Sequence, residues 1–417
     1  MAGEWLDTTI GGQATLQRGI DITKAEQRFG VVPVISSGGV SSYHDTPAAV
    51  GPGVVLGRKG VVGSVYFVAS DYWPHDTTLW VKDFHGNEPR YVYYFFRWMA
   101  PRIATMDVGS ANPTLNRNHV HPIEVSWPPL EEQRAIAHIL GTLDDKIELN
   151  RRMNETLEAM ARALFKSWFV DFDPVRAKAA GRDPGLANGL ADLFPDSFQD
   201  TELGEIPEGW RCSNLREVTS KIGSGATPRG GGSVYVADGV ALVRSQNVYD
   251  SLFVWDGLAR ITDAAAAALS GVSVEHEDVL LNITGASILR TCVVDPEVLP
   301  ARVNQHVCIV RPKPEMPSRY IHLHLLQPST KAFLMGMDAG ASRQAVTKGH
   351  IESVPLVLPP KTVLDAFARL VGPMFRATSH SMSQSRSLAS ARDALLPKLI
   401  SGDIRVADAE RIAGSAT

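Results

Sequence analysis

Glycine-flanked loops in both halves of the chain carry side chains suited to reading nucleic acid. Arg58 and Lys59 stand between Gly57 and Gly60, and residues 282–285 occupy the matching place in the second half. Arginine, asparagine and glutamine can make paired hydrogen bonds to base edges, whereas lysine mainly contacts phosphate. The candidate DNA-contacting residues are Arg18, Arg58, Lys59, Arg117, Arg229, Arg244, Gln246, Asn247, Arg290, Arg343 and Lys348. For any one of these residues, the alternative is a solvated surface side chain with no role in binding. The presence of two such clusters at corresponding places in both halves favours DNA binding.

Other patterns that could support chemistry are incomplete. Residues 223–228 lack the lysine and spacing of a P-loop and are interpreted as a tight turn before a strand. His322 and His324 alternate like metal ligands without a third ligand nearby, so we predict surface histidines on a helix. Asp171 and Asp173 are predicted to cap the start of a linker. We find no nucleotide loop, no amino-methylation motif and no acidic nuclease cluster, and therefore expect no catalytic centre, metal or cofactor in this chain.

Composition and charge limit the class of protein. The chain has 417 residues, enough for two or three domains, with 44% hydrophobic and 21% charged residues. We predict a soluble cytoplasmic protein on three grounds. The three cysteines form no close pair, no apolar stretch reaches about 20 residues, and the first residues do not resemble a signal peptide. The net charge of −4 disfavours a DNA-binding protein that acts alone, but permits one that acts within a complex.

An internal repeat predicts the architecture. Residues 106–169 recur as residues 337–400 at a constant shift of 231 positions. Upstream the similarity is weaker: Trp5 matches Trp210, the pair 18–19 matches 224–225, and Gly60 matches Gly285, with a shift that rises from 205. Loop insertions in a diverged duplicate produce such a rise, and chance similarity is the alternative. The repeat predicts an α+β domain followed by a long helix, twice over.

Each repeat ends in a predicted helix, at residues 130–170 and 361–400. Apolar residues follow a heptad stripe with a polar middle in both helices. The first stripe is Ile136, Leu140, Leu143, Ile147, Asn150, Asn154, Leu157, Ala161 and Leu164. The second is Phe367, Val371, Met374, Thr378, Ser381, Ser385, Leu388, Arg392 and Leu395. Polar midpoints coincide best in an antiparallel coiled coil with a pseudo-two-fold axis; two helices packed separately on their own domains are the alternative.

The remaining segments complete the expected organisation. Proline, glycine and acidic residues predict a linker at 171–203, and a polar, frayed tail is expected at 401–417. Residues 372–373, Gly-Pro, should kink or interrupt the second long helix. Short β-branched segments predict strands, and residues 90–104 and 318–336 are predicted helices. The predicted strands are residues 31–35, 61–68, 77–81, 240–243, 278–283, 291–294 and 306–310.

Several stretches in this order resemble one known family. They are residues 128–137, 144–150, 167–174, 204–210, 224–228 and 395–402. Over nearly its whole length the chain resembles the DNA-specificity subunit of type I restriction-modification enzymes, although residues 361–364 depart from the usual glutamate-rich helix start. The resemblance implies target-recognition domains at 1–129 and 204–360, separated by two long antiparallel helices that measure the unread spacer of a split DNA site.

The resemblance also implies partners. Two methyltransferase subunits would bind S-adenosylmethionine and dock on the helices, and restriction subunits that use ATP and magnesium would join to cleave double-stranded DNA. The candidate partner-binding residues are Glu131, Gln133, Ile136, Leu140, Leu143, Ile147, Leu157, Leu388 and Leu395. The alternatives are a modification-only or orphan subunit of the same fold and a non-catalytic protein adaptor.

Overall fold

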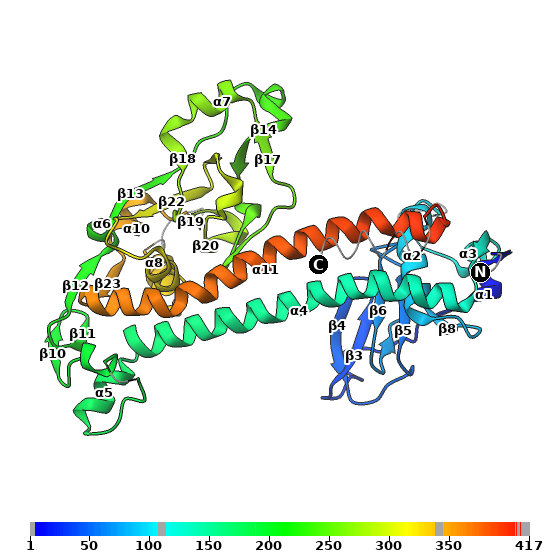
Figure 1. The fold of residues 1–417 in the computed structure, drawn as a ribbon, viewed down its shortest axis with the longest axis horizontal. Coiled ribbons are helices and arrows are strands. Elements are labelled where there is room, and N and C mark those ends of the chain that lie inside the picture. The colour runs from blue at the N-terminus through cyan, green and yellow to red at the C-terminus, as the bar shows by residue number, and fades with distance from the viewer. Residues whose placement is uncertain are drawn as a thin grey trace. The chain divides into compact units, whose positions relative to one another are not determined.

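The computed structural model describes residues 5–106, 114–187, 189–337, 345–404, 406 and 409 (Figure 1). The chain divides into two compact units, which are described separately. Unit 1 comprises Met1–Arg152 and Ser381–Thr417, and unit 2 comprises Met153–His380. Both long helices are therefore shared between the units, which differs from the linear division into domains and helices that the sequence predicts. Among the described residues, no helix is long and apolar enough to cross a membrane.

Unit 1 is built on two small sheets. The four-stranded sheet has the order β2 (Thr15–Arg18), β8 (Thr78–Asp83), β5 (Gly53–Gly57) and β6 (Val65–Val68). The three-stranded sheet has the order β4 (Gly39–His44), β3 (Val32–Ser36) and β7 (Trp73–Pro74). Strand β1 (Leu6–Thr9) pairs with β9 (Glu124–Trp127), and the short helices are α1 (Ile10–Gln13) and α3 (Arg117–Val120).

Helix α2 (Pro89–Ala104) fills the core of unit 1. It begins at a proline, and the side chain of Glu88 accepts a hydrogen bond from the Arg90 backbone N–H, so both signals of a helix start are present. Its aromatic face is buried, and Phe95 stacks edge-on against Trp127 with ring centres 4.7 Å apart. The helix that the sequence predicts at 90–104 is therefore confirmed.

Unit 2 repeats this plan with insertions. Its first four-stranded sheet has the order β13 (Thr219–Ser224), β22 (Val307–Pro312), β19 (Val279–Asn282) and β20 (Thr291–Val293). The second has the order β17 (Ala259–Ile261), β14 (Tyr235–Val243), β21 (Ala301–Val303) and β18 (Ser273–Val274). The two-stranded pairs are β12 (Arg211–Asn214) with β23 (Pro355–Leu358), β10 (Phe198–Thr201) with β11 (Gly204–Pro207), and β15 (Val248–Tyr249) with β16 (Leu252–Phe253).

The helices of unit 2 outside the long pair are short. They are α5 (Asp173–Ala179), α6 (Leu215–Val218), α7 (Asp263–Ala268), α8 (Ser318–Leu325), α9 (Pro328–Gly336) and α10 (Lys348–Glu352). The single helix predicted at 318–336 is thus two helices. Pro328 explains the break, because the residue before a proline is disfavoured in helical geometry, and Gln327 has an extended backbone.

The two units share one topology, which confirms the duplication. The sheet order β2-β8-β5-β6 in unit 1 corresponds to β13-β22-β19-β20 in unit 2, and the pair β1-β9 corresponds to β12-β23. Isolated bridges join Lys59 to Thr114 and Thr284 to Ala345 at matching places. Gly60 and Gly285, matched by the repeat, both have positive φ, +79° and +76°. The two glycines therefore mark the same turn in each unit, one that disfavours any residue with a Cβ.

The long helices are α4 (Leu130–Phe169) and α11 (Lys361–Ser401), and they pack antiparallel. In unit 1, Asp144 meets Arg392, and Asn150, further along α4, contacts Ser381, earlier on α11. In unit 2, Phe165 lies against Phe367, with ring centres 6.0 Å apart. The predicted antiparallel pair is therefore confirmed. Helix α11 runs without a break, so the interruption predicted at residues 372–373 is wrong; Val371 and Phe375 are buried on either side and hold the helix in place.

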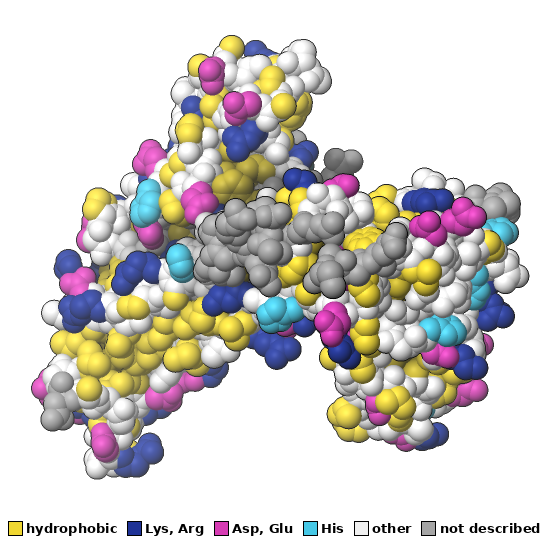
Figure 2. All heavy atoms as spheres, turned by 45° about the vertical axis from the view of Figure 1, so that its right-hand side comes forward, with side chains coloured by type: hydrophobic (Ala, Val, Ile, Leu, Met, Phe, Trp, Pro, Cys, Tyr) yellow, Lys and Arg dark blue, Asp and Glu magenta, His cyan; other side chains and the backbone are white. Residues whose placement is uncertain are grey.

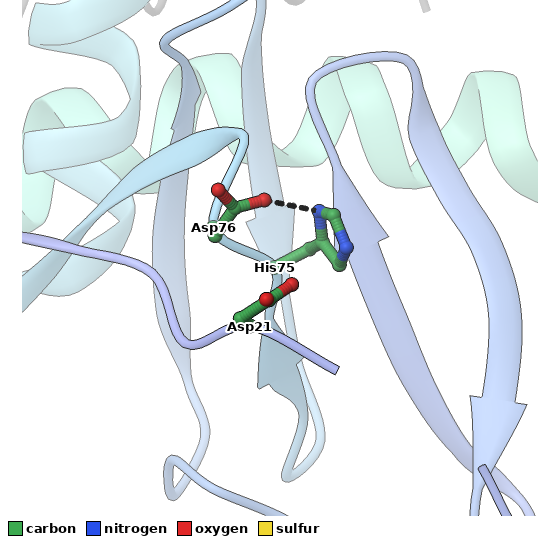
Figure 3. Close-up of side chains that lie close together, drawn as sticks. All are labelled: Asp21, His75 and Asp76. Carbon is green, nitrogen blue, oxygen red and sulfur yellow. Dashed lines mark ion pairs between the residues drawn. The ribbon is translucent and has the colours of Figure 1, made fainter. Parts of the chain in front are cut away.

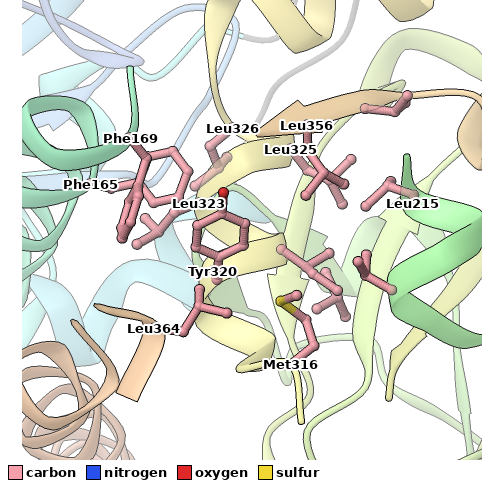
Figure 4. Packing of buried hydrophobic residues seen from close by; sticks show 14 of the residues in the cluster. Phe165, Phe169, Leu215, Met316, Tyr320, Leu323, Leu325, Leu326, Leu356 and Leu364 are labelled. Atoms are coloured by element: carbon pink, nitrogen blue, oxygen red, sulfur yellow. The ribbon is translucent and has the colours of Figure 1, made fainter. Parts of the chain in front are cut away.

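The segment predicted as a linker, 171–203, packs as part of unit 2. Phe172, Val175 and Phe194 are buried beside Trp168 and Trp210 in the core that Figure 4 shows in part. Lys178 donates to the carbonyl of Ala191, which closes the segment on itself. The predicted tail also differs from expectation, since Ala409 is buried in the core of unit 1. In both places apolar side chains outweigh the local proline, glycine and charge signals.

Candidate nucleic-acid interface

Three of the predicted DNA-contacting residues of unit 1 line one hollow. Arg18, Arg58 and Arg117, far apart in the sequence, surround a depression of about 850 Å³. Arg18 ends β2, Arg58 follows β5 directly, and Arg117 is the first residue of α3. Two strands of one sheet, β2 and β5 on either side of β8, and the helix α3 thus bring together side chains that the sequence alone could not place. Lys59 joins them, because its ammonium lies 3.9 Å from Asp76, which also binds Arg18.

The backbone around this hollow is tightly packed. A Cβ at Gly19 would lie 2.0 Å from the carbonyl oxygen of His75, and one at Gly57 would lie 2.0 Å from that of Val61. Only glycine fits at these two positions, which hold the ends of β2 and β5 close to their neighbours. The helix α3 is capped by Asn116, whose side chain accepts from the Asn118 backbone N–H. These contacts fix the directions from which Arg18, Arg58 and Arg117 enter the hollow.

The cations are balanced by few carboxylates. Arg18 donates to Asp76 at 2.9 Å, and the side chain of Arg18 stays 57% exposed. Arg58 donates to the backbone carbonyl of Asp76 at 3.5 Å, and burial, followed by the nearby Arg18, lowers the pKa of its guanidinium. Arg117 donates to the carbonyl of Leu16 at 3.3 Å. The arrangement can present several N–H donors to phosphate oxygens or to base edges.

Asp21, which lines the same hollow, lies close to His75 and Asp76 (Figure 3). Their potential ligand atoms lie within 4.8 Å of one another, and His75 Nδ1 lies 3.3 Å from Asp76 Oδ1. Such donors can hold a divalent cation, but Asp76 is already paired with Arg18. We therefore interpret Asp76 as the acidic partner of the cations rather than as a metal ligand.

The predicted residues of unit 2 divide into exposed and buried ones. Arg244 and Gln246 both donate to the carbonyl of Gly257, at 2.6 and 3.1 Å. The guanidinium of Arg290 lies over the ring of Tyr249, 4.3 Å from its centre, and Arg229 lines a separate hollow of about 630 Å³. All four residues can be reached from solvent and remain candidates.

The three further candidates in unit 2 have other outcomes. Lys348 is exposed and lies 3.6 Å from Glu352. Asn247 is fully buried and bonds to the backbone of Arg244 and Val254, so its predicted DNA contact is wrong. Its amide instead satisfies backbone groups inside the unit. Arg343 lies outside the described residues.

Sequence reasoning missed several residues of the unit 1 hollow. Gln17, Asn116 and His119 line it together with the arginines. The repeat held a signal for His119, because the constant shift aligns it with His350. Asn116 has a signal of a different kind, since it directly precedes a helix and asparagine is a common cap.

Most predicted partner-binding residues point into the protein and are corrected here. The structure buries Gln133, Ile136, Leu140, Leu143, Leu388 and Leu395. Gln133 donates to Asn87 Oδ1 and Pro128 O, and the five apolar residues form the core between the helices and the domain of unit 1. Ile147 and Leu157 are half-buried, and Glu131 is exposed. A heptad stripe identifies the seam between two helices of one chain as readily as it identifies an interface with another chain.

The histidines of α8 are also corrected. His322 is fully buried and lies 3.1 Å from the hydroxyl of Ser251, and His324 is partly buried against the carbonyl of Pro355. They are core histidines and not surface residues. Burial lowers the pKa of both, to about 4 for His324.

Comparison with known proteins agrees with the fold. Residues 3–159 match the family model described as Type I restriction modification DNA specificity domain. The chain is 26% identical over 334 residues to the Type I restriction enzyme HindI specificity subunit of Haemophilus influenzae, covering 70% of this chain and 71% of that one. It is also 26% identical over 327 residues to the MjaIX specificity subunit of Methanocaldococcus jannaschii, covering 77% and 70%.

A solved structure shares the whole fold. The chain aligns with the type I restriction-modification S subunit from M. genitalium with a TM-score of 0.63 and 15% identity, covering 95% of this chain and 96% of that one. The chain is thus similar in sequence to type I restriction enzyme specificity subunits and shares the fold of this S subunit.

Proposed function

We propose that this chain recognises a bipartite DNA sequence, with one half-site read by each duplicated domain, and directs partner enzymes to it. The observation that carries the proposal is a shared backbone frame with different side chains. Leu115 N–H bonds to Arg58 O in unit 1, and Val346 N–H bonds to Ile283 O in unit 2, both at 2.9 Å. At matched positions unit 1 has Arg58 and Lys59 where unit 2 has Ile283 and Thr284.

A duplicated frame with divergent loop residues suits a split target. A frame shared by both units keeps the approach to DNA the same, while changed side chains alter which base edges are contacted. The chain's net charge of −4 supports action within a complex, because neutralising phosphates alone would require a basic surface. On the face shown in Figure 2, Lys and Arg side chains are interspersed with acidic and hydrophobic ones.

The partners and cofactors follow from the same proposal. The chain would act in the cytoplasm with two methyltransferase subunits that bind S-adenosylmethionine, and with restriction subunits that use ATP and magnesium. The exposed Glu131 is the predicted docking residue that stays accessible, with Ile147 and Leu157 half-accessible. The chain itself would hold none of these cofactors.

Exchange of one domain tests the proposal. Residues 204–360 are replaced by the equivalent segment of a relative, and methylated adenines are mapped by single-molecule sequencing in a host that also carries the methyltransferase. We expect one half of the methylated motif to change while the other half and the presence of a spacer persist. Deletion of the chain is the control and should abolish the motif. An unchanged motif after exchange, or a motif that survives deletion, would contradict the proposal.

A further inference from the structure

The matched frames also align residues that the sequence did not single out. The corresponding backbone bonds run from Gly19 to Thr78 (3.0 Å) and Gly225 to Val307 (3.1 Å), and from His75 to Ile35 (2.9 Å) and Asn304 to Val243 (3.0 Å). Asp21 follows Gly19 by two residues as Thr227 follows Gly225, and Asp76 follows His75 as Gln305 follows Asn304. The acidic pair of unit 1 thus stands where unit 2 has a threonine and a glutamine.

In unit 1 these positions hold an arginine in place. Asp76 Oδ2 accepts from Arg18 Nη2 at 2.9 Å, while Oδ1 faces His75, and the carboxylate is mostly buried (Figure 3). A guanidinium has five N–H donors in a planar fork, so one bond to Asp76 leaves donors for a second acceptor pair. The acceptors that fit this fork on a base edge are guanine O6 and N7.

In unit 2 the residue at one of these positions is Gln305, and hydrogen bonds hold its amide in place. Gln305 Oε1 accepts from the hydroxyl of Thr227 at 2.7 Å, and its Nε2 lies 3.1 Å from His306 Nε2. Because an amide nitrogen only donates, His306 Nε2 accepts, and its Nδ1 donates to Thr284 Oγ1, 2.7 Å away. Gln305 is nevertheless exposed.

This hydrogen-bonded chain sets the plane of the glutamine amide. The amide oxygen can accept a second hydrogen bond and the amide nitrogen can donate a second one. One acceptor beside one donor is the pattern that pairs with adenine N6 and N7.

We propose that these matched positions set the base class read by each unit. Arg18, held by Asp76, contacts a guanine in one half-site, and Gln305, held by Thr227 and His306, contacts an adenine in the other. Asp76, Thr227 and His306 act as positioning residues. The inference rests on the proposed function, since it assumes that both units face DNA.

The charged side chains near Arg18 and near Gln305 also differ between the two units. Unit 1 places Arg58 and Lys59 beside Arg18, whereas the matched residues of unit 2 are the neutral Ile283 and Thr284. A dense group of cations suits the guanine edge, which presents two acceptors, and a neutral amide suits the mixed donor and acceptor edge of adenine. The neighbouring side chains in each unit are thus consistent with the base class proposed for that unit.

Base-exchange variants in the assembled complex test the inference. Arg18→Lys keeps the charge but removes the planar fork, and should relax one G·C pair in one half-site by on the order of tenfold. Arg18→Gln should shift that pair towards A·T. In the other half-site, Gln305→Glu replaces the donor by an acceptor and should shift one A·T pair towards cytosine. Both residues are exposed at the surface, so folding and assembly should persist, which circular dichroism and co-purification verify.

The readout is base preference at each position of the methylated motif, and the matched control is Lys59→Ala. A residue that contacts phosphate should lower methylation uniformly across sites, without a change of base preference. The inference is overturned if the Arg18 and Gln305 variants behave like Lys59→Ala, if both alter the same half-site, or if the relaxed pairs are of the opposite type. Failure of the proposed function looks different, because the wild-type chain would then direct no split motif at all.

Discussion

At the scale of single residues, a buried ion pair joins Asp278, just before β19, to Arg311 of β22. Asp278 is fully buried and accepts from Arg311 at 2.7 and 2.9 Å, and from the Glu275 backbone N–H at 2.7 Å. The hydrogen bond to Asp278 raises the pKa of the Arg311 guanidinium and outweighs burial, which lowers it. Such a pair stabilises weakly as a whole, but removal of one partner leaves the other charge uncompensated.

Replacement of this carboxylate should therefore be costly. We expect Asp278→Ala to lower the free energy of unfolding of unit 2 by on the order of 3 kcal/mol. The matched control is Glu275→Ala, which removes an exposed carboxylate from the same arginine and should cost less than about 1 kcal/mol. Hydrogen exchange of the β19 and β22 amides measures both. Equal protection in the two variants would contradict the role assigned to Asp278.

The buried histidines predict how stability depends on pH. Burial lowers the pKa of His324 to about 4, against an ordinary value of 6.5. Between these values the unfolded chain binds a proton that the folded chain does not, so stability should fall as the pH drops from about 6.5 to about 4. The loss from this group is on the order of 3 kcal/mol at most.

The variant His324→Gln keeps an N–H donor for the Pro355 carbonyl and removes the titration. Urea unfolding of unit 2 at several pH values should show a flatter dependence in this variant. His276→Gln, at an exposed position, is the control and should follow the wild-type curve. A wild-type dependence that His324→Gln leaves unchanged would contradict the assignment.

At the scale of elements, the polar middle of the long helices sets how they pair. Asn150 is 1% exposed, and its amide nitrogen donates to Gln384 Oε1 at 2.9 Å, Ser385 Oγ at 3.2 Å and Ser381 O at 3.3 Å. A buried polar group finds partners in only one alignment of two helices, so it specifies register at some expense of stability. The apolar ends add packing energy, and the centre decides the alignment.

Truncation of this amide should weaken the pairing. We expect Asn150→Ala to lower the free energy of unfolding of unit 1 by about 1–3 kcal/mol, because the acceptors on α11 lose their donor. Leu149→Ala, at an exposed neighbouring position, should change it by less than about 0.5 kcal/mol. Denaturation with urea compares the two variants. A smaller loss for Asn150→Ala than for Leu149→Ala would contradict the role of the polar centre.

A glycine inside α4 shows how an element accommodates its domain. A Cβ at Gly141 would lie 2.8 Å from the guanidinium carbon of Arg90. Arg90 bonds to the carbonyl of Gly141 at 3.2 Å and pairs with Asp145 at 2.9 Å. A glycine inside a helix costs about 1 kcal/mol relative to alanine. Gly141 is present despite this cost because the side chain of Arg90, from α2, packs closely against α4 there.

At the scale of the whole molecule, the two units interleave along the chain. Unit 1 needs the end of α11, because Leu388, Leu395 and Leu399 lie in its core, whereas unit 2 is one continuous segment. Each fully buried leucine contributes about 1.5–3 kcal/mol, so a unit 1 without these residues would lack much of its stability. The last part of the chain therefore completes the first domain.

Fragments test this interleaving. We expect a fragment of residues 153–380 to fold alone, and a fragment of residues 1–152 to remain without cooperative unfolding until residues 381–417 are supplied. Circular dichroism with thermal denaturation measures both. The control is a peptide of residues 381–417 in which Leu388 and Leu395 are alanine, which should fail to rescue. A cooperative transition in residues 1–152 alone would contradict the shared core.

Local patterns predicted the elements well and the exposure of individual residues poorly. The strands around residues 32–35 and 307–310 and the long helices follow from β-branched segments and heptads, which are local signals. The partners of Asn247 and Gln133 are backbone groups and side chains brought near by the fold, so their burial had no local signal. The prediction of a linker at 171–203 was wrong because proline and glycine residues indicated a loop there. The aromatic residues between them are buried in the core of unit 2.

By itself the sequence determined the duplication and the antiparallel helix pair, because the repeat and the hydrophobic periodicity can be detected along the chain. Only the tertiary structure decided which loop residues meet. Arg18, Arg58 and Arg117 share a hollow because three strands and a helix converge there, and Asp76 and Gln305 were recognised as counterparts only through matched backbone bonds. Non-local pairing sets which side chains are exposed and which groups they face, and no short window of sequence contains that information.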